Sequence, residues 1–126
     1  MRAVDTNVLV RLVTRDDQRQ LAAAEAFIAK GAWVSTLVLA EASWVLGTVY
    51  GLQHDEIATV VEMLLAHDHL SLHDAEMVAA ALEHYRAVPA LGFTDCLVLE
   101  LARKAGHLPL GTFDKRLSKL DGAERL

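Results

Sequence analysis

The sequence predicts an α/β sandwich, in which a mostly parallel sheet of short strands has helices on both faces. Short apolar segments alternate along the chain with longer segments whose apolar residues recur at helical spacing. Strands that alternate with helices in this way pair in parallel and are covered by the helices between them. With 126 residues, 53% of them hydrophobic, the chain can bury one core but not two, so we expect a single domain over residues 1–126.

Apolar spacing and capping residues place the individual elements. Asp5 ends the first expected strand, Thr36 is a candidate N-cap, and Gly31 and Gly51 follow helices as C-terminal residues do. We expect strands at 2–5, 32–35, 70–72 and 108–112, and helices at 7–13, 18–30, 37–50, 54–66, after Asp74, and at 94–104, with a last helical turn after Asp114.

Composition and charge narrow the class of protein. A net charge of -5 argues against a protein that holds nucleic acid only by neutralising phosphates. It does not argue against a nuclease, because bound divalent cations offset the charge of the carboxylates in its site. No apolar run approaches the ~20 residues of a membrane helix, and the N-terminal segment has no signal-peptide character. The single cysteine, Cys96, cannot form an internal disulfide. We therefore expect a cytoplasmic protein with no membrane association.

Four carboxylates occupy positions where ligands gather in a parallel sheet, outside the carboxyl ends of the strands. Asp5 ends the first expected strand. Asp114 follows the last expected strand, at 108–112, and Asp95 opens the helix that precedes that strand. Glu41 lies within a nearly apolar helix, where an unpaired buried carboxylate is costly. Each has a simpler explanation: Asp5 and Asp114 as caps, Asp95 as a favourable first-turn residue, and Glu41 as half of a buried ion pair.

Taken together, the four carboxylates indicate a metal site. Gathered in one place they would repel one another and be partly protonated unless cations lay between them. Hard oxygen ligands suit Mg²⁺ or Mn²⁺ rather than zinc. The chemistry that most needs such a site is in-line hydrolysis of a phosphodiester, where one metal activates the water and another stabilises the leaving oxygen.

Four sequence blocks closely resemble the PIN-domain ribonucleases, in particular the VapC toxins of bacterial toxin–antitoxin systems. The blocks are Asp5-Thr-Asn7-Val-Leu, Thr36-Leu-Val-Leu-Ala-Glu41, Thr94-Asp95-Cys-Leu-Val-Leu-Glu-Leu-Ala and Thr112-Phe-Asp114. They follow one another in the family's order over the whole chain. The resemblance implies a PIN-like three-layer sandwich, endonucleolytic cleavage of RNA, a homodimer, and a VapB-like antitoxin as partner.

The resemblance also implies roles for single residues. Asn7 and Thr112 would be polar residues that support the ligands, and many relatives carry a further acid where this chain has Gly92, a departure that bears on the second metal ion. The residues implied to hold one or two Mg²⁺ or Mn²⁺ ions and to activate the attacking water are Asp5, Glu41, Asp95 and Asp114.

Other features leave alternatives open. Basic residues could line an RNA groove, although charged helix faces are usually only solvated; they are Arg11, Arg15, Arg103, Lys104, Lys115 and Arg116. The cluster of His67, His69 and His73 lies at a polar junction without cysteine partners. A PIN-like scaffold without activity and a DNA-directed nuclease of the same fold are the rival functions, because metal-assisted hydrolysis does not itself distinguish the 2′-hydroxyl.

Overall fold

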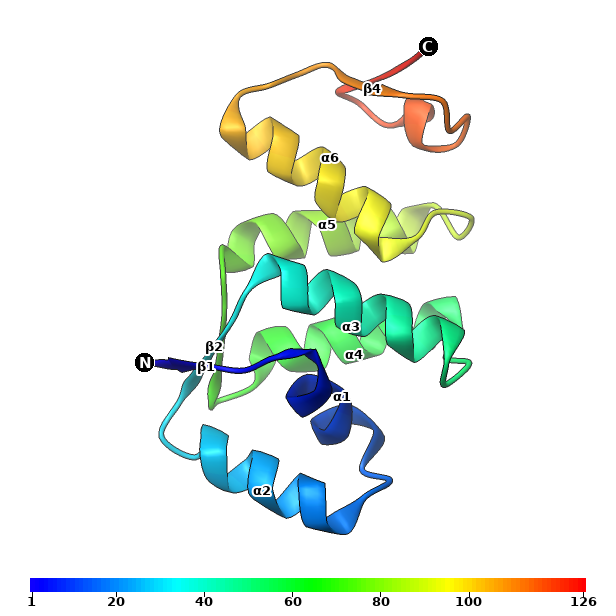
Figure 1. The fold of residues 1–126 in the computed structure, drawn as a ribbon. Helices are drawn as coiled ribbons and strands as arrows, with labels where there is room; N and C mark the ends of the chain where they lie inside the picture. The colour runs from blue at the N-terminus through cyan, green and yellow to red at the C-terminus, as the bar shows by residue number, and fades with distance from the viewer. The chain divides into compact units, whose positions relative to one another are not determined.

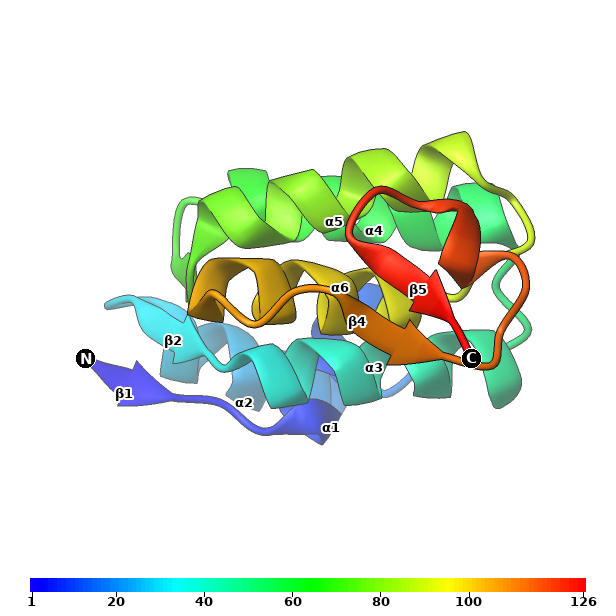
Figure 2. The ribbon, with the colours of Figure 1, turned by 90° about the horizontal axis from the view of Figure 1, so that it is seen from above.

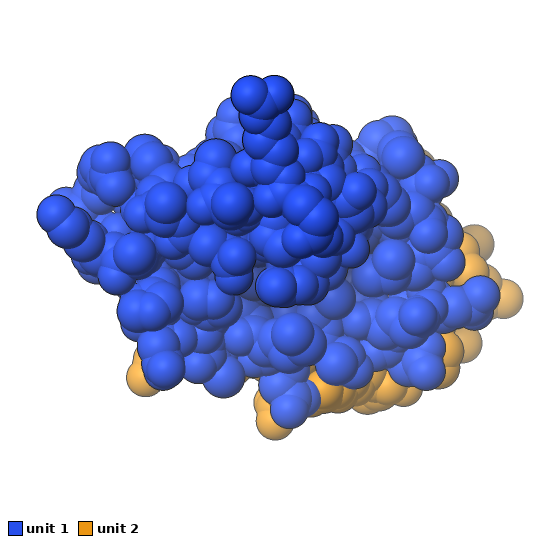
Figure 3. All heavy atoms as spheres, turned by 90° about the horizontal axis from the view of Figure 1, so that it is seen from below, with its two compact units in different colours: residues 1–75 blue, residues 76–126 orange.

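The computed structural model describes all 126 residues and confirms an α/β fold in which every strand pair is parallel. The chain divides into two units, residues 1–75 and 76–126, which are coloured separately in Figure 3. Each unit is described by itself below, and the expectation of one domain over the chain stays a prediction. None of the six helices has the length and apolar character that a membrane span requires.

The first unit contains a three-stranded parallel sheet in the order β1-β2-β3. Backbone hydrogen bonds extend the ladders beyond the strands, because Val4 N donates to Trp33 O at 3.1 Å and His73 N donates to Val34 O at 2.9 Å. Alternation decides which side chains are buried: Val34 is buried, whereas Trp33 is exposed. The strands are β1 (Arg2–Ala3), β2 (Ala32–Val34) and β3 (Leu70–Leu72).

Four helices complete the first unit (Figure 1). The prediction that Thr36 is an N-cap is wrong: β2 ends at Val34, so Ser35 has the extended backbone of a cap and its Oγ accepts from Val38 N at 3.1 Å. Thr36 instead begins the helix, with its Oγ1 buried and without a partner. The helices are α1 (Thr6–Thr14), α2 (Gln18–Ile28), α3 (Thr36–Thr48) and α4 (His54–Ala66).

The core of the first unit lies where these helices contact one another and the sheet. Helix α1 contacts α2 and α3, and α4 contacts α3 and β3. Each fully buried leucine or valine contributes roughly 1.5–3 kcal/mol relative to exposure. The largest of these fully buried side chains are Leu9, Val34, Leu39, Leu46 and Val61.

The second unit combines two helices with a small parallel sheet, so the strands form two separate ladders rather than one. Figure 2 shows β4 and β5 side by side, with Leu110 opposite Ala123 and Thr112 opposite Arg125. Strand β5 was not predicted, because it is short and polar and follows a turn at Gly122 with φ +94°. The elements are α5 (Ala75–Ala87), α6 (Phe93–Ala105), β4 (Leu110–Thr112), the 3₁₀ helix η1 (Leu117–Lys119) and β5 (Ala123–Arg125).

Candidate active site

Asp5 lies where β1 gives way to α1 and is the N-cap of that helix. Its Oδ1 accepts a hydrogen bond from Val8 N at 3.2 Å, as a capping aspartate does. The side chain is exposed, and Asn7 in the first turn of the helix is exposed as well. The cap uses one carboxylate oxygen, and Oδ2 accepts no hydrogen bond. Capping and metal binding are therefore compatible at Asp5.

Glu41 is exposed, although its neighbours in the sequence are mostly apolar. Helix α3 buries Leu39, Ala42 and Leu46, whereas Leu37 and Trp44 lie on its open side and are 75% and 62% exposed. Glu41 shares that open side because it is four residues after Leu37 and three before Trp44. The ion-pair explanation for Glu41 is wrong, since no basic side chain contacts it. Its carboxylate is solvated and available to a ligand.

Asp95 occupies the first turn of α6 and is half-buried. A Cβ placed on Gly92 would lie 3.5 Å from Asp95 Oδ2, which is ordinary contact. A side chain at residue 92 would therefore begin in contact with the Asp95 carboxylate. Next to it, Cys96 is fully buried, and burial, with the nearby charges of Asp95 and Glu100, raises the pKa of its thiol to about 12. A thiol held protonated in this way is no nucleophile, and Cys96 is a packed core residue.

Asp114 organises a tight turn after β4. Its Oδ1 accepts from Arg116 N at 2.8 Å and from Leu117 N at 3.0 Å, and its own N donates to Thr112 Oγ1 at 3.0 Å. The two backbone donors at Leu117 and Arg116, with the Arg116 charge, lower the pKa of Asp114. The carboxylate is therefore held ionised, and Oδ2 accepts no hydrogen bond. Thr112 contacts the backbone of Asp114 rather than its carboxylate.

The four carboxylates are divided evenly between the units. Asp5 and Glu41 belong to residues 1–75, on the helices that follow the adjacent strands β1 and β2, and Asp95 and Asp114 belong to residues 76–126. Neither unit by itself gathers three or more histidine, cysteine, aspartate or glutamate side chains into a group that could hold a metal ion. The assembly of all four into one site stays a prediction from the sequence.

Comparison with known families decides what kind of protein carries these carboxylates. Residues 2–123 match the PIN domain family. The chain belongs to the PIN domain family. PIN domains are generally metal-dependent nucleases, so nuclease activity is the function that membership supports, and the predicted PIN-like fold is confirmed. Neither curated proteins nor solved structures gave a match.

The donor chemistry of this PIN domain fits a hard divalent cation. All four candidate ligands are carboxylates, the ligand type that Mg²⁺ and Mn²⁺ prefer. Asp5 and Asp114 each direct one oxygen to a helical backbone, which fixes the side chain and leaves the other oxygen for a cation. Glu41 is exposed and Asp95 is half-buried, so a ligand can replace solvent at either carboxylate.

The basic side chains of the PIN domain differ in how many hydrogen bonds and ion pairs they form within the protein. Arg11 NH1 donates to Tyr50 Oη at 2.9 Å and to Asp16 Oδ1 at 3.0 Å, contacts that raise its pKa. Arg15 lies 3.9 Å from Glu25. Lys115 and Arg116 are exposed beside Asp114, and only a long contact of 3.9 Å joins Arg116 to that carboxylate. Arg11 is therefore the most engaged of these residues, whereas Arg15, Lys115 and Arg116 are exposed and make no ion pair shorter than 3.9 Å.

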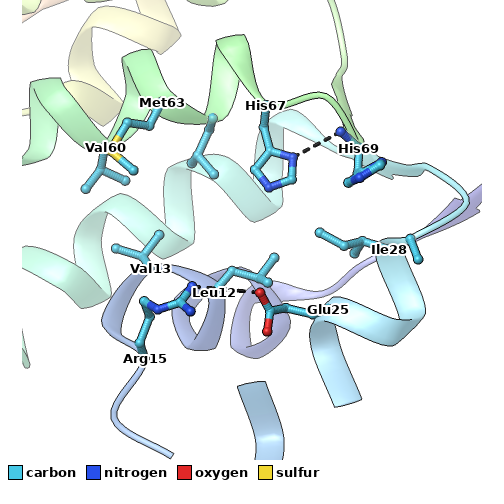
Figure 4. Close-up of a pocket in the computed structure, with 11 residues that line it drawn as sticks. Leu12, Val13, Arg15, Glu25, Ile28, Val60, Met63, His67 and His69 are labelled. Carbon is cyan, nitrogen blue, oxygen red and sulfur yellow. Dashed lines mark hydrogen bonds and ion pairs between the residues drawn. The ribbon is translucent and has the colours of Figure 1, made fainter. Parts of the chain in front are cut away.

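A separate apolar groove lies in the first unit between α1, α2 and α4 (Figure 4). It has a volume of about 530 Å³, and the Arg15–Glu25 pair and the two histidines His67 and His69 lie at its edges. His67 Nδ1 accepts from His69 N at 3.0 Å, and His73 lies edge-on to Trp33, so the three histidines make different contacts. The apolar residues that line the groove are Leu12, Val13, Ile28, Ala29, Val60, Met63 and Leu64.

Sequence reasoning missed the one buried carboxylate of the chain, Glu100 on α6, which is 7% exposed. Its Oε1 lies 2.7 Å from His84 Nε2 on α5, and its Oε2 accepts from Arg103 Nε at 2.9 Å. Arg103 NH2 also donates to Asp121 O at 2.6 Å. The helical spacing of Glu100 and Arg103 could have indicated their pairing. Nothing in the order of residues indicates His84 or Asp121.

Proposed function

We propose that this PIN domain is an endoribonuclease dependent on Mg²⁺ or Mn²⁺, and that it is the toxin of a VapBC-type toxin–antitoxin system acting in the cytoplasm. The observation that carries the proposal is the state of the capping carboxylates. Asp5 and Asp114 are fixed by backbone hydrogen bonds through one oxygen and present the other, in a chain whose match to the PIN family spans residues 2–123.

In this proposal each residue has a definite task. One or two divalent ions, when bound, stabilise negative charge on the phosphate and make water a stronger nucleophile. Asp114 needs no cation to remain ionised, because the turn that it caps already lowers its pKa. Thr112 holds that turn through its hydroxyl, and in this proposal the exposed amide of Asn7 orients the ligands or the phosphate. The residues proposed to hold the ions are Asp5, Glu41, Asp95 and Asp114.

The antitoxin and the homodimer belong to the same proposal. The groove between α1, α2 and α4 is lined by apolar side chains, and Met63 in it is 63% exposed. A groove of this kind fits the apolar face of a helix, which supports docking of a VapB-like antitoxin. Leu37 and Trp44 on the open side of α3 support an interface between two copies. Met63→Glu should abolish antitoxin binding, and Trp44→Glu should yield a monomer.

A panel of substrates and metals tests the proposed activity. Purified, antitoxin-free protein is incubated with structured RNA, unstructured RNA and DNA of the same sequence, in Mg²⁺, Mn²⁺ or EDTA. We expect cleavage of RNA that requires metal, with DNA left intact. Equal cleavage of RNA and DNA would contradict a ribonuclease and indicate a general nuclease. No cleavage by the folded protein would favour an inactive PIN-like scaffold that binds RNA.

A further inference from the structure

Phe113 is the most exposed large apolar side chain of the second unit, at 81%. It lies between Thr112, the last residue of β4, and the proposed metal ligand Asp114. A phenylalanine left in water forgoes the stabilisation that burial of its ring would give. Its neighbours in the sequence are polar, and the exposed Leu126, whose N–H donates to Thr112 O, lies at the same end of the β4–β5 ladder. Phe113 is therefore the one exposed aromatic ring at this end of the small sheet, next to a single exposed leucine.

The backbone that carries Phe113 is held firmly. Thr112 O accepts from Leu126 N at 2.9 Å, and Thr112 Oγ1 accepts from Asp114 N at 3.0 Å. On the other side, the Asp114 carboxylate accepts from the N–H groups of residues 116 and 117. The ring therefore projects from a turn that is fixed before any ligand binds. Preorganisation of this kind lowers the entropic cost of binding.

Positive charge lies on the same segment. Lys115 and Arg116 are exposed and follow Asp114 directly, and Arg125 on β5 is exposed and opposite Thr112. The segment thus combines an open aromatic face with cations beside a carboxylate of the proposed site. Proteins that bind single-stranded nucleic acid use the same combination, in which bases stack on aromatic rings and phosphates contact basic residues.

We propose that Phe113 stacks on an unpaired base of the RNA next to the scissile phosphate, with Lys115 and Arg116 on the flanking phosphates. The inference rests on the proposed ribonuclease function and adds a base-stacking contact of Phe113 beside the proposed site. A base within a duplex cannot reach the ring without leaving its stack, so structured RNA is cut only at loops, bulges and ends.

Binding to the Asp95→Asn protein tests the inference without cleavage. The probe is a fluorescent single-stranded RNA titrated in Mg²⁺, with 2-aminopurine at successive positions to report stacking. Phe113→Ala should weaken binding by about 5- to 150-fold, since one stacked base contributes ~1–3 kcal/mol. Phe113→Tyr and Phe113→Trp should restore binding, whereas Phe113→Leu, which is apolar but has no ring, should behave like alanine. Leu101→Ala on α6, where the leucine is 40% exposed, is the matched control.

The outcomes separate this inference from the function on which it rests. Unchanged binding by Phe113→Ala, or full rescue by Phe113→Leu, would overturn the stacking role, as would a change of oligomeric state in Phe113→Ala. Cleavage of RNA that does not depend on Phe113 would overturn this inference alone. Phe113-dependent binding by a protein that cleaves nothing would overturn the proposed nuclease and leave the base-stacking role intact.

Discussion

Replacing Arg103 by alanine should destabilise the protein far more than an ordinary surface substitution. The guanidinium donates to the buried carboxylate of Glu100 at 2.9 Å and to the carbonyl of Asp121 at 2.6 Å. It also packs on Gly122, where a Cβ would lie 3.0 Å from Arg103 NH2. These contacts join α6 to the segment that leads into β5, so their loss should loosen the whole C-terminal part of the second unit.

The magnitude follows from the burial of Glu100. The side chain of Glu100 is 8% exposed and that of Arg103 is 35% exposed. A hydrogen bond to a buried charge contributes about 1.5–3 kcal/mol, and an exposed one to a carbonyl about 0.5–1.5 kcal/mol. We expect the free energy of unfolding to fall by about 3 kcal/mol, of which the larger part is the carboxylate left with only His84 as partner. For a chain of this size that corresponds to a melting temperature lower by about 10 °C.

Urea denaturation and calorimetry measure this loss, with Lys119→Ala as the control because Lys119 is exposed in the same unit. Arg103→Lys, which keeps the charge but not the planar fork of donors, should recover only part of the stability. A loss below about 0.5 kcal/mol for Arg103→Ala, the range of an ordinary surface substitution, would refute the reasoning. It would mean that water replaces the guanidinium at Glu100 without cost.

Three further predictions concern the carboxylates and the cysteine. Gly92→Asp, with Gly92→Asn as control, should lower the Mn²⁺ concentration for half-maximal cleavage, because a Cβ there lies 3.5 Å from Asp95 Oδ2; an unchanged or higher concentration would contradict it. Because the pKa of Asp114 is lowered by folding, its ionised carboxylate stabilises the metal-free protein above the unfolded pKa of about 3.9. The stability advantage of wild type over Asp114→Asn should therefore decrease as the pH falls through the folded pKa, and an advantage that did not change as the pH was lowered would oppose this. Cys96, with a pKa of about 12, should resist iodoacetamide at pH 8 until the protein is unfolded, and mass spectrometry showing rapid labelling of the native protein would contradict its packed role.

The order and type of the elements could be predicted because their signals are local. The helix at 54–66 and the strand at 70–72 were predicted at their observed bounds, from an apolar stripe and a short apolar segment. Asp5 and Asp114 were identified as candidate caps from their positions alone. Asp5 is the N-cap of α1, whereas the N-cap of η1 is Arg116, and Asp114 accepts from the backbone of the turn that leads into it. A capping role, however, does not exclude a ligand role, because each carboxylate has two oxygens.

The errors have physical causes that the order of residues does not reveal. A buried ion pair was one explanation for Glu41 because its neighbours are apolar, but α3 leaves Leu37, Glu41 and Trp44 open on the same side. The buried carboxylate is Glu100, whose partner His84 lies on another helix, 16 residues away. Strand β5 has polar residues and forms through pairing with β4, not through apolar alternation. Tertiary contacts, which the sequence does not display, decide all three.

Metal-dependent cleavage by variants of the four carboxylates tests the central claim most directly. Asp5→Asn, Glu41→Gln, Asp95→Asn and Asp114→Asn are compared with wild type on single-stranded RNA in Mn²⁺. Asp68→Asn and Glu83→Gln, exposed acids from the first and second unit, are the matched controls. The account predicts that each of the four loses at least about a hundredfold in rate, as expected for loss of charge stabilisation at the reacting phosphate, while both controls cleave normally. Wild-type rates in folded Asp5→Asn and Asp95→Asn proteins would contradict it.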